Sequence, residues 1–279
     1  MSAICGWYGI SRQAYYQQVR RDGARTAQEQ QVLELVRQQR QKHPRLGTRK
    51  LLHELRDALQ ARGIRMGRDR LFDLLRRAGL LIGRRRNRRR TTWSGAWHSP
   101  NLLQEVTVTA PNQAWVSDIT YVETEERFGY LCLVMDHYSR YILGFDFCDS
   151  LAVEGAQRAL AMAVRQAGGA TANTILHSDH GIQYTCHAFR EDLDRYLMRA
   201  SMGQVGNCYE NAHAERLNGI LKQEYALDQR FLDLAQARRA ILEAIWLYNH
   251  ERPHLSLNYR KPVQVHFDVA QPVLSLSTV

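Results

Sequence analysis

The chain has 279 residues, enough for one large domain or two ordinary ones, and no stretch of eighteen apolar residues that could span a membrane. The first residues do not have the charged start and long apolar run of a secretory signal. The five cysteines form no C-x-x-C pair, which favours reduced thiols in the cytoplasm over disulfides or a structural zinc site.

Charge divides the chain into two unequal parts. Residues 1–100 hold 23 Lys and Arg against 7 Asp and Glu, whereas residues 101–279 hold 15 against 21. A strongly basic segment of this kind is typical of a nucleic-acid partner, because binding releases counterions from the phosphates. A protein with an Arg-rich surface and no such partner is the alternative.

Short helices are predicted across the first third of the chain. Thr48 is predicted to cap the second helix and Gly79 to end the third. Basic outer faces suit a DNA binder of the helix-turn-helix type, with Arg68 and Arg70 as candidates for DNA contact, although other small bundles share this pattern. The predicted buried stripes are Val32, Leu35 and Val36; Leu51, Leu52, Leu55 and Leu59; and Leu71, Phe72, Leu74 and Leu75.

A run of arginines, "RRRNRRR", follows these helices. No buried structure tolerates such a charge density, so the run is predicted to be a solvated linker or an arm that lies on DNA phosphates. A nuclear-localisation signal is the alternative. The arginines are Arg84, Arg85, Arg86, Arg88, Arg89 and Arg90.

From Asn112 the pattern changes to strands and then to strands that alternate with helices. Strands are predicted over residues 114–122, 129–136, 141–147 and 174–179, and helices over 151–168, 187–198, from the end of the loop 203–211 to about 227, and over 234–251. Trp246, Leu247 and Tyr248 of the last helix are predicted core residues. The fold class expected is α/β, a mixed sheet flanked by helices.

Two aspartates mark a candidate site on this sheet. Asp118 interrupts an apolar strand, where an acid is costly unless it is paired, capped or bound to a metal. Asp179 ends the strand 174–179, a position where α/β sheets commonly form sites. Two acids on adjacent strands repel each other, and a divalent cation is the usual way to relieve that repulsion.

Glu215 is the third candidate acid, on a predicted helix. Around that helix Lys222 falls about 20° from Glu215, and Asn211 and Asn218 fall within about 60° of it. An ordinary amphipathic surface helix would share this stripe. Lys222 is expected to hold a cation against a DNA phosphate or a base. The opposite, apolar side consists of Leu217, Ile220 and Leu221.

Together the three acids suggest two-metal chemistry, with two Mg²⁺ or Mn²⁺ ions per active site rather than zinc. Such a site would activate a water or a sugar hydroxyl and stabilise the leaving oxygen of a phosphodiester. Gln183 and Tyr184 lie just past Asp179 and either contact DNA or pack in the interior.

Four ordered blocks of the sequence resemble a known family. "WVSDITYV", "HSDHGIQY" and "GNCYENAHAERLNGILKQEY" are similar to the three signature blocks of the DDE transposases of the IS3 family, second-frame product, and "YNHERPHLSLNYRKP" is similar to the C-terminal block. The resemblance assigns the catalytic and metal-binding acids to Asp118, Asp179 and Glu215, with 35 residues between the last two, and the basic residue to Lys222. It implies a ribonuclease-H-like core and Mg²⁺-dependent DNA cleavage and joining.

Two features depart from the family pattern. Glu210-Asn211-Ala212 stands where the family usually has Asp-Asn-Ala, and Glu210 lies about 140° around the helix from Glu215, so it is not the expected catalytic acid. The working transposase of the family usually carries an upstream-frame product, fused by frameshifting, with its own helix-turn-helix and leucine zipper. The chain contains no heptad run of that kind.

Four regions are therefore expected: a helix-turn-helix-like DNA-binding region (1–83), an Arg-rich linker or arm (84–111), a ribonuclease-H-like DDE core (112–227), and a C-terminal helix and tail (228–279). The predicted function is that of a transposase, a DDE polynucleotidyl transferase that cuts and joins double-stranded DNA at insertion-sequence ends and targets. The alternative is a DNA-binding transposition regulator, or a partner subunit that is inactive without the upstream-frame product. A homo-oligomer on DNA, in the bacterial cytoplasm at the nucleoid and away from membranes, is the expected setting.

Overall fold

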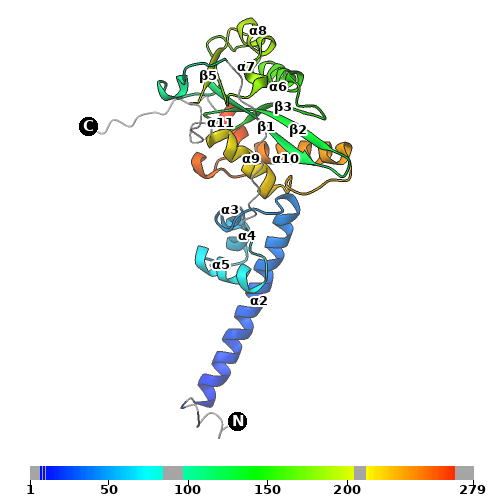
Figure 1. Ribbon diagram of the computed structural model, residues 1–279. Helices are drawn as coiled ribbons and strands as arrows, with labels where there is room; N and C mark the ends of the chain where they lie inside the picture. The colour runs from blue at the N-terminus through cyan, green and yellow to red at the C-terminus, as the bar shows by residue number, and fades with distance from the viewer. Residues whose placement is uncertain (1–6, 8, 10, 84–96, 204–211, 268–279) are drawn as a thin grey trace, which may run out of the picture. The chain divides into compact units, whose positions relative to one another are not determined.

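The computed structural model describes residues 7, 9, 11–83, 97–203 and 212–267. The chain divides into two compact units, Met1–Gly83 and Arg84–Val279, each with its own hydrophobic core (Figure 1). None of the helices within these described ranges is both long and apolar enough to cross a membrane.

The first unit consists of helices packed around one small core. They are α2 (Arg12–Lys42), α3 (Thr48–Glu54), α4 (Arg56–Ala61) and α5 (Arg68–Arg77). All the residues predicted to be buried here lie in or against that core except Phe72, which is exposed. Ser11, whose hydroxyl accepts a hydrogen bond of 3.1 Å from the Ala14 amide, caps α2.

Two expectations for the first unit need correction, and one is confirmed. The predicted second helix is divided at Leu55 into α3 and α4. Thr48 does not cap it, because Thr48 is already the first helical residue and Gly47 occupies the capping position without a side chain. Gly79 does end α5, since it adopts a φ of +67° that favours glycine, and the Leu80 amide closes the turn on the Leu75 carbonyl at 2.8 Å.

A five-stranded mixed sheet forms the centre of the second unit. Its strands are β1 (Ala114–Glu123), β2 (Phe128–Asp136), β3 (Ile142–Cys148), β4 (Ile175–Ser178) and β5 (Arg199–Met202), in the order β3-β2-β1-β4-β5. β1, β2 and β3 are antiparallel, whereas β4 pairs parallel with β1, and β5 parallel with β4. The short strand β5 was not predicted, because the four residues "RASM" are too few to give a clear strand pattern.

Helices cover both faces of this sheet (Figure 1). α6 (Val153–Gln166), α7 (Ile182–Thr185) and α8 (His187–Arg195) contribute to one core, and α9 (Ala212–Glu224) and α10 (Leu234–His250) to the other. α11 (Pro262–Phe267) and the 3-10 turns η1 (Leu102–Gln104) and η2 (Leu255–Leu257) complete the unit. The predicted α/β fold, a ribonuclease-H-like mixed sheet flanked by helices, is confirmed.

Alternation along β1 decides which face each side chain occupies. Trp115 and Ile119 pack in the core that α6 and α8 cover, and Val116 and Val122 pack in the core that α9 and α10 cover. Asp118 shares the parity of Val116 and Val122. The carboxylate therefore lies on the face of the sheet covered by α9.

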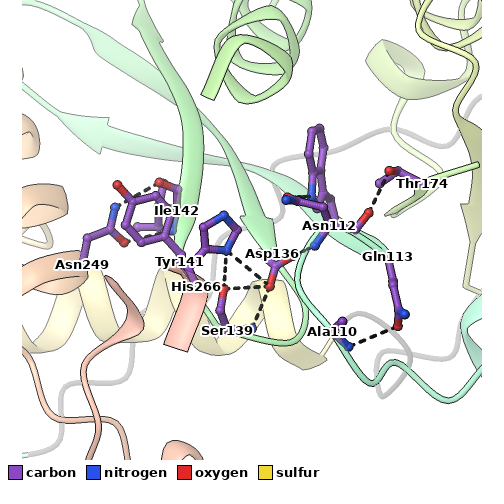
Figure 2. A network of polar contacts seen from close by, with 11 residues as sticks. Ala110, Asn112, Gln113, Asp136, Ser139, Tyr141, Ile142, Thr174, Asn249 and His266 are labelled. Carbon is purple, nitrogen blue, oxygen red and sulfur yellow. Dashed lines mark hydrogen bonds and ion pairs between the residues drawn. The ribbon is translucent and has the colours of Figure 1, made fainter. Parts of the chain in front are cut away.

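A buried polar network ties distant segments to the end of β2 (Figure 2). Asp136, which is fully buried, accepts hydrogen bonds of 2.7 Å each from the Asn112 amide, the Ser139 amide and the Ser139 hydroxyl. The Ser139 hydroxyl in turn lies 2.9 Å from Nδ1 of His266 in α11. The network thus joins the entry to β1, the β2–β3 turn and α11.

Candidate active site

Strand pairing brings the first two acids together. In the parallel pair of β1 and β4, Val116 lies opposite His177, so two residues further along each strand come Asp118 and Asp179. Both side chains are half-buried. Oδ1 of Asp179 accepts a hydrogen bond of 2.9 Å from the Gly181 amide, which closes a tight turn just after β4. The two strands therefore bring both carboxylates to the same place on the sheet.

Helix α9 presents its polar stripe to this place. Nδ2 of Asn218 donates a hydrogen bond of 2.6 Å to Oδ2 of Asp118. Glu215, one turn earlier on the same stripe, is exposed. The apolar side of α9, with Leu217, Ile220 and Leu221, is buried against β1 and β2 as predicted. One helix thus supplies both the packing surface and the polar groups that face Asp118.

Lys222 is held at the end of the same stripe. Its Nζ lies 3.9 Å from the centre of the Tyr121 ring, in a cation–π contact. Burial lowers the pKa of Lys222, and the opposing charge of Asp118 partly offsets that effect. The ammonium group therefore lies within electrostatic reach of the acidic pair. Tyr121, the residue that supports it, was not recognised in the sequence.

The electrostatics of Asp118 are those of an uncompensated acid. Burial, followed by the negative charges of Asp179 and Glu215, raises the pKa of Asp118 to about 8. The Ile119 amide, which donates a hydrogen bond of 2.9 Å to Oδ1 of Asp118, and the Lys222 charge act in the opposite direction. The three acids therefore interact, and negative charge exceeds positive charge among them.

The donor set suits a hard divalent cation, because it consists of carboxylate oxygens with no sulfur or imidazole ligand. A bound cation would relieve the repulsion that raises the pKa of Asp118. As the side chains stand, no group of three His, Cys, Asp or Glu residues in the described parts of the chain could hold a metal ion. The acids fit such an ion by chemistry and charge, and their side chains must turn inward to bind it.

Gln183 and Tyr184 lie in the interior, which favours packing over DNA contact. Tyr184 is fully buried, and its hydroxyl lies 2.9 Å from the Ser117 hydroxyl, directly beside Asp118 in the chain. Nε2 of Gln183 donates to the Leu151 carbonyl at 2.8 Å. DNA could reach neither side chain without a change in this packing. Both residues therefore support the site from within.

A buried ion pair braces the far end of α9. Arg252, which follows α10, is 2 % exposed and forms two hydrogen bonds to Glu224, Nε to Oε2 at 2.9 Å and Nη2 to Oε1 at 3.1 Å. The bidentate geometry fixes the last turn of α9 against the segment after α10. Only the resemblance of the C-terminal block pointed to Arg252 in the sequence.

The basic residues of the first unit lie at its surface. Arg68 is exposed, with its Nε 2.7 Å from Oδ1 of Asp69, and Arg70 is half-buried, with Nη1 3.2 Å from the Arg65 carbonyl. The predicted arm Arg84–Arg90, and Glu210 and Asn211, lie outside the described residues. A surface hollow in the first unit is lined by Arg25, Arg70, Asp73, Arg76 and Arg77.

Comparison with known proteins identifies two segments of an integrase core domain. Residues 108–208 match one family model of this description and residues 196–262 match another. The chain is 35% identical over 267 residues to the uncharacterized 31 kDa protein of insertion element IS600 from Shigella sonnei, covering 93% of this chain and 96% of the relative. It is 33% identical over 204 residues to the transposase InsF for insertion sequence IS3A from Escherichia coli, covering 72% and 70%.

Among solved structures, the catalytic core domain of HTLV-2 integrase in complex with magnesium is similar to this chain. The TM-score is 0.45 at 21% sequence identity, with 56% of this chain and 97% of that chain covered.

Proposed function

Because the chain belongs to the IS3 family of insertion-sequence transposases, we propose that it cuts and joins DNA strands at the ends of such an element, with Asp118, Asp179 and Glu215 as its catalytic acids. Relatives that carry an integrase core domain support a role in DNA transposition. Our proposal adds to this role the reaction and the residues that perform it.

The observation that carries the proposal is the convergence of three separate elements on Asp118. β1 and β4 bring Asp118 beside Asp179, and α9 directs Asn218 to Asp118 at 2.6 Å. The charge of Glu215, from the same helix, acts on the Asp118 carboxylate. Acids that repel one another reduce the stability of the fold. Such clusters are typical of catalytic sites.

Two Mg²⁺ or Mn²⁺ ions held by the three carboxylates would supply an activated water or 3′-hydroxyl and charge stabilisation for the leaving oxygen. The chain's own groups would orient that site. Asn218 fixes the Asp118 carboxylate through its amide, and Lys222 places a positive charge near the DNA phosphates. Glu215 is exposed on α9, so rotation of its long side chain would bring it toward Asp118.

The partners proposed are double-stranded DNA at the element ends and at the target, a second copy of the chain on that DNA, and the upstream-frame product. The basic surface of the first unit, with Arg68 and Arg70, and the Arg84–Arg90 segment would grip phosphates without reading bases.

A strand-transfer assay with a labelled element-end duplex, a target duplex and Mg²⁺ tests the proposal. Asp179→Asn removes one acid, and Asp194→Asn, an exposed aspartate of α8, is the matched control. We expect nicked and joined products from the wild type and Asp194→Asn and none from Asp179→Asn, with DNA binding unchanged. Each protein is assayed alone and fused to the upstream-frame product. Joined product from Asp179→Asn in either form overturns the assignment.

A further inference from the structure

A cavity lies on the side of α9 opposite Glu215 and Asn218. It has a volume of about 290 Å³, and α9 contributes His213, Arg216, Leu217 and Ile220 to its wall. Around the helix these positions fall on the side opposite Glu215 and Asn218. The β2–β3 turn and the segment after α10 close the cavity. The other lining residues are Met135, Arg140, Tyr248, His254, Leu255 and Ser256.

The lining of this cavity is positively charged and contains no carboxylate. Arg140 is half-buried, with Nη1 3.0 Å from Nδ1 of His213, and Arg216 is exposed. Neither guanidinium forms an ion pair with any acid in the described ranges. Burial lowers the pKa of Arg140, the charges of Tyr248 and Asp136 partly offset that effect, and the charge of Arg216 adds to it. The two arginines therefore lie within electrostatic reach of each other, and neither forms an ion pair of its own.

Four other arginines of the second unit form ion pairs. Arg252 pairs with Glu224, Arg158 with Asp146, Arg127 with Asp149 and Arg195 with Asp192. Arg140 and Arg216 have no such acidic partner among the described residues. Two positive charges near each other repel, and an anion bound between them relieves that repulsion.

His213 reinforces this preference for an anion. Since a guanidinium can only donate, Nδ1 of His213 must accept from Arg140, and Nε2 must carry the hydrogen. The cavity wall thus offers hydrogen-bond donors from two guanidiniums and an imidazole N–H.

We propose that this cavity, the Arg140–Arg216 pocket, binds one phosphate group of a DNA strand that extends to the acidic site. This inference rests on the proposed function. Guanidiniums match phosphate oxygens in geometry and charge, and the volume suits a phosphodiester rather than a whole nucleotide cofactor. The pocket and Glu215 lie on opposite sides of one helix, whose diameter is about 10 Å.

The salt dependence of DNA binding tests the pocket directly. Fluorescence anisotropy of a labelled element-end duplex is measured from 50 to 200 mM KCl for full-length wild type, Arg216→Gln, Arg140→Gln and Arg165→Gln. Arg165 is an exposed arginine of α6, on the opposite face of the sheet, so its loss changes net charge equally without touching the pocket. All variants carry Asp179→Asn so that no strand is cut during the measurement.

We expect Arg216→Gln to reduce the slope of log K against log salt by about 0.9, because one phosphate contact is lost. The difference in DNA affinity between Arg216→Gln and the parent protein, which carries only Asp179→Asn, would then shrink about 3.5-fold from 50 to 200 mM KCl. Arg165→Gln should keep the parental slope. Equal slopes for Arg216→Gln and Arg165→Gln overturn the proposal. Arg216 is exposed, so this variant tests the pocket even if Arg140→Gln fails to fold.

The two proposals can fail separately. If the wild type joins no strands but Arg216→Gln still reduces the salt dependence of DNA binding, the catalytic proposal is wrong and the pocket proposal stands. If Asp179→Asn abolishes joining while all slopes agree, only the pocket falls. Calorimetry with inorganic phosphate identifies a third result: phosphate binding that requires Arg216, without any effect on DNA slopes, makes this a free-anion site and overturns the DNA assignment.

Discussion

Asp118 and Asp136 lie on neighbouring strands of one hairpin, yet their surroundings are opposite. Asp136 is fully buried, and burial alone would raise its pKa, but hydrogen bonds from His266, Ser139 and Asn112 outweigh that effect and lower it (Figure 2). Asp118 is half-buried, receives hydrogen bonds from the Ile119 amide and Asn218, and has two acids beside it that help raise its pKa to about 8. The degree of burial therefore does not separate the two. What separates them is whether the surrounding groups neutralise the charge.

Whether its neighbours neutralise a carboxylate distinguishes a structural acid from a candidate catalytic one. A carboxylate that is fully satisfied from inside the chain has no capacity left for a ligand, and its loss is a loss of stability. A carboxylate surrounded by other acids has negative charge to share with a cation, and its loss costs activity instead. The predictions below test this division.

The largest effect is expected for Asp118→Asn. Mg²⁺-dependent strand transfer should fall by at least about 10³-fold, or about 4 kcal/mol of barrier, since one ligand of the proposed cations is lost. The amide is isosteric and uncharged, so thermal unfolding without metal should occur at an equal or higher temperature than in the wild type. An Asp118→Asn protein that keeps its activity but unfolds more easily would reverse the roles assigned to the two aspartates.

Asp136→Ala should mainly affect stability. Three buried donors lose their acceptor, and we expect the free energy of unfolding to fall by about 3 kcal/mol in urea denaturation. Asp194→Ala, at an exposed position on α8, should change it by less than about 0.5 kcal/mol. A similar, small effect of both substitutions would mean that the network around Asp136 does not hold the β2–β3 turn and α11 together.

The pKa shifts of the two aspartates predict opposite effects of pH on the stability of the fold. The lowered pKa of Asp136 means that its contribution to stability is complete above the unfolded value near 4 and is lost as the pH falls through the folded value. The pKa of Asp118, raised to about 8, means that the folded state binds more protons between pH 4 and 8, so stability without metal declines as the pH rises across that window.

Comparing the stability of the wild type with that of each Asp→Asn variant isolates the contribution of each aspartate. The partial exposure of Asp118 limits its effect to about 2 kcal/mol between pH 4 and 8, and Asp118→Asn should remove that decline. Asp136→Asn should instead remove the loss on the acid side. Urea midpoints at pH 3, 5, 7 and 8 give both differences, and parallel curves for wild type and Asp118→Asn would contradict the raised pKa.

The smallest effect concerns which neighbour acts on Asp118 more strongly. The charge of Asp179 raises the pKa of Asp118 more than that of Glu215 does. Asp179→Asn should therefore lower this pKa more than Glu215→Gln, as measured by carbon-13 chemical shifts of the Asp118 carboxyl during titration. A larger effect of Glu215→Gln would show that Glu215 turns inward without a metal ion.

Local patterns were sufficient to predict the strands and helices that hold the site. The apolar alternation of β1 and the stripe of α9 follow from single segments, and both are present with Asp118 and Asn218 in contact. The strand β5 escaped prediction because only its pairing with β4 makes it a strand. Trp246, predicted to be core, is 52 % exposed and stacks on His250, because it lies on the outward side of α10.

The buried network around Asp136 depends on long-range contacts that no single segment of the sequence reveals. The partners of Asp136 are 3, 24 and 130 positions away in the chain, in Ser139, Asn112 and His266. Nothing in the sequence near Asp136 shows that three such donors converge on it. Arg140 and Arg216 likewise line one cavity only through the fold and carry no local signature.

The most direct test of the account is an anomalous diffraction measurement on crystals of the full chain with an element-end duplex and Mn²⁺. We expect two anomalous peaks within about 2.0–2.4 Å of carboxylate oxygens from Asp118, Asp179 and Glu215, with Glu215 turned toward the sheet. Mn²⁺ bound elsewhere on the chain, with no peak among these three acids while DNA is bound, would contradict it.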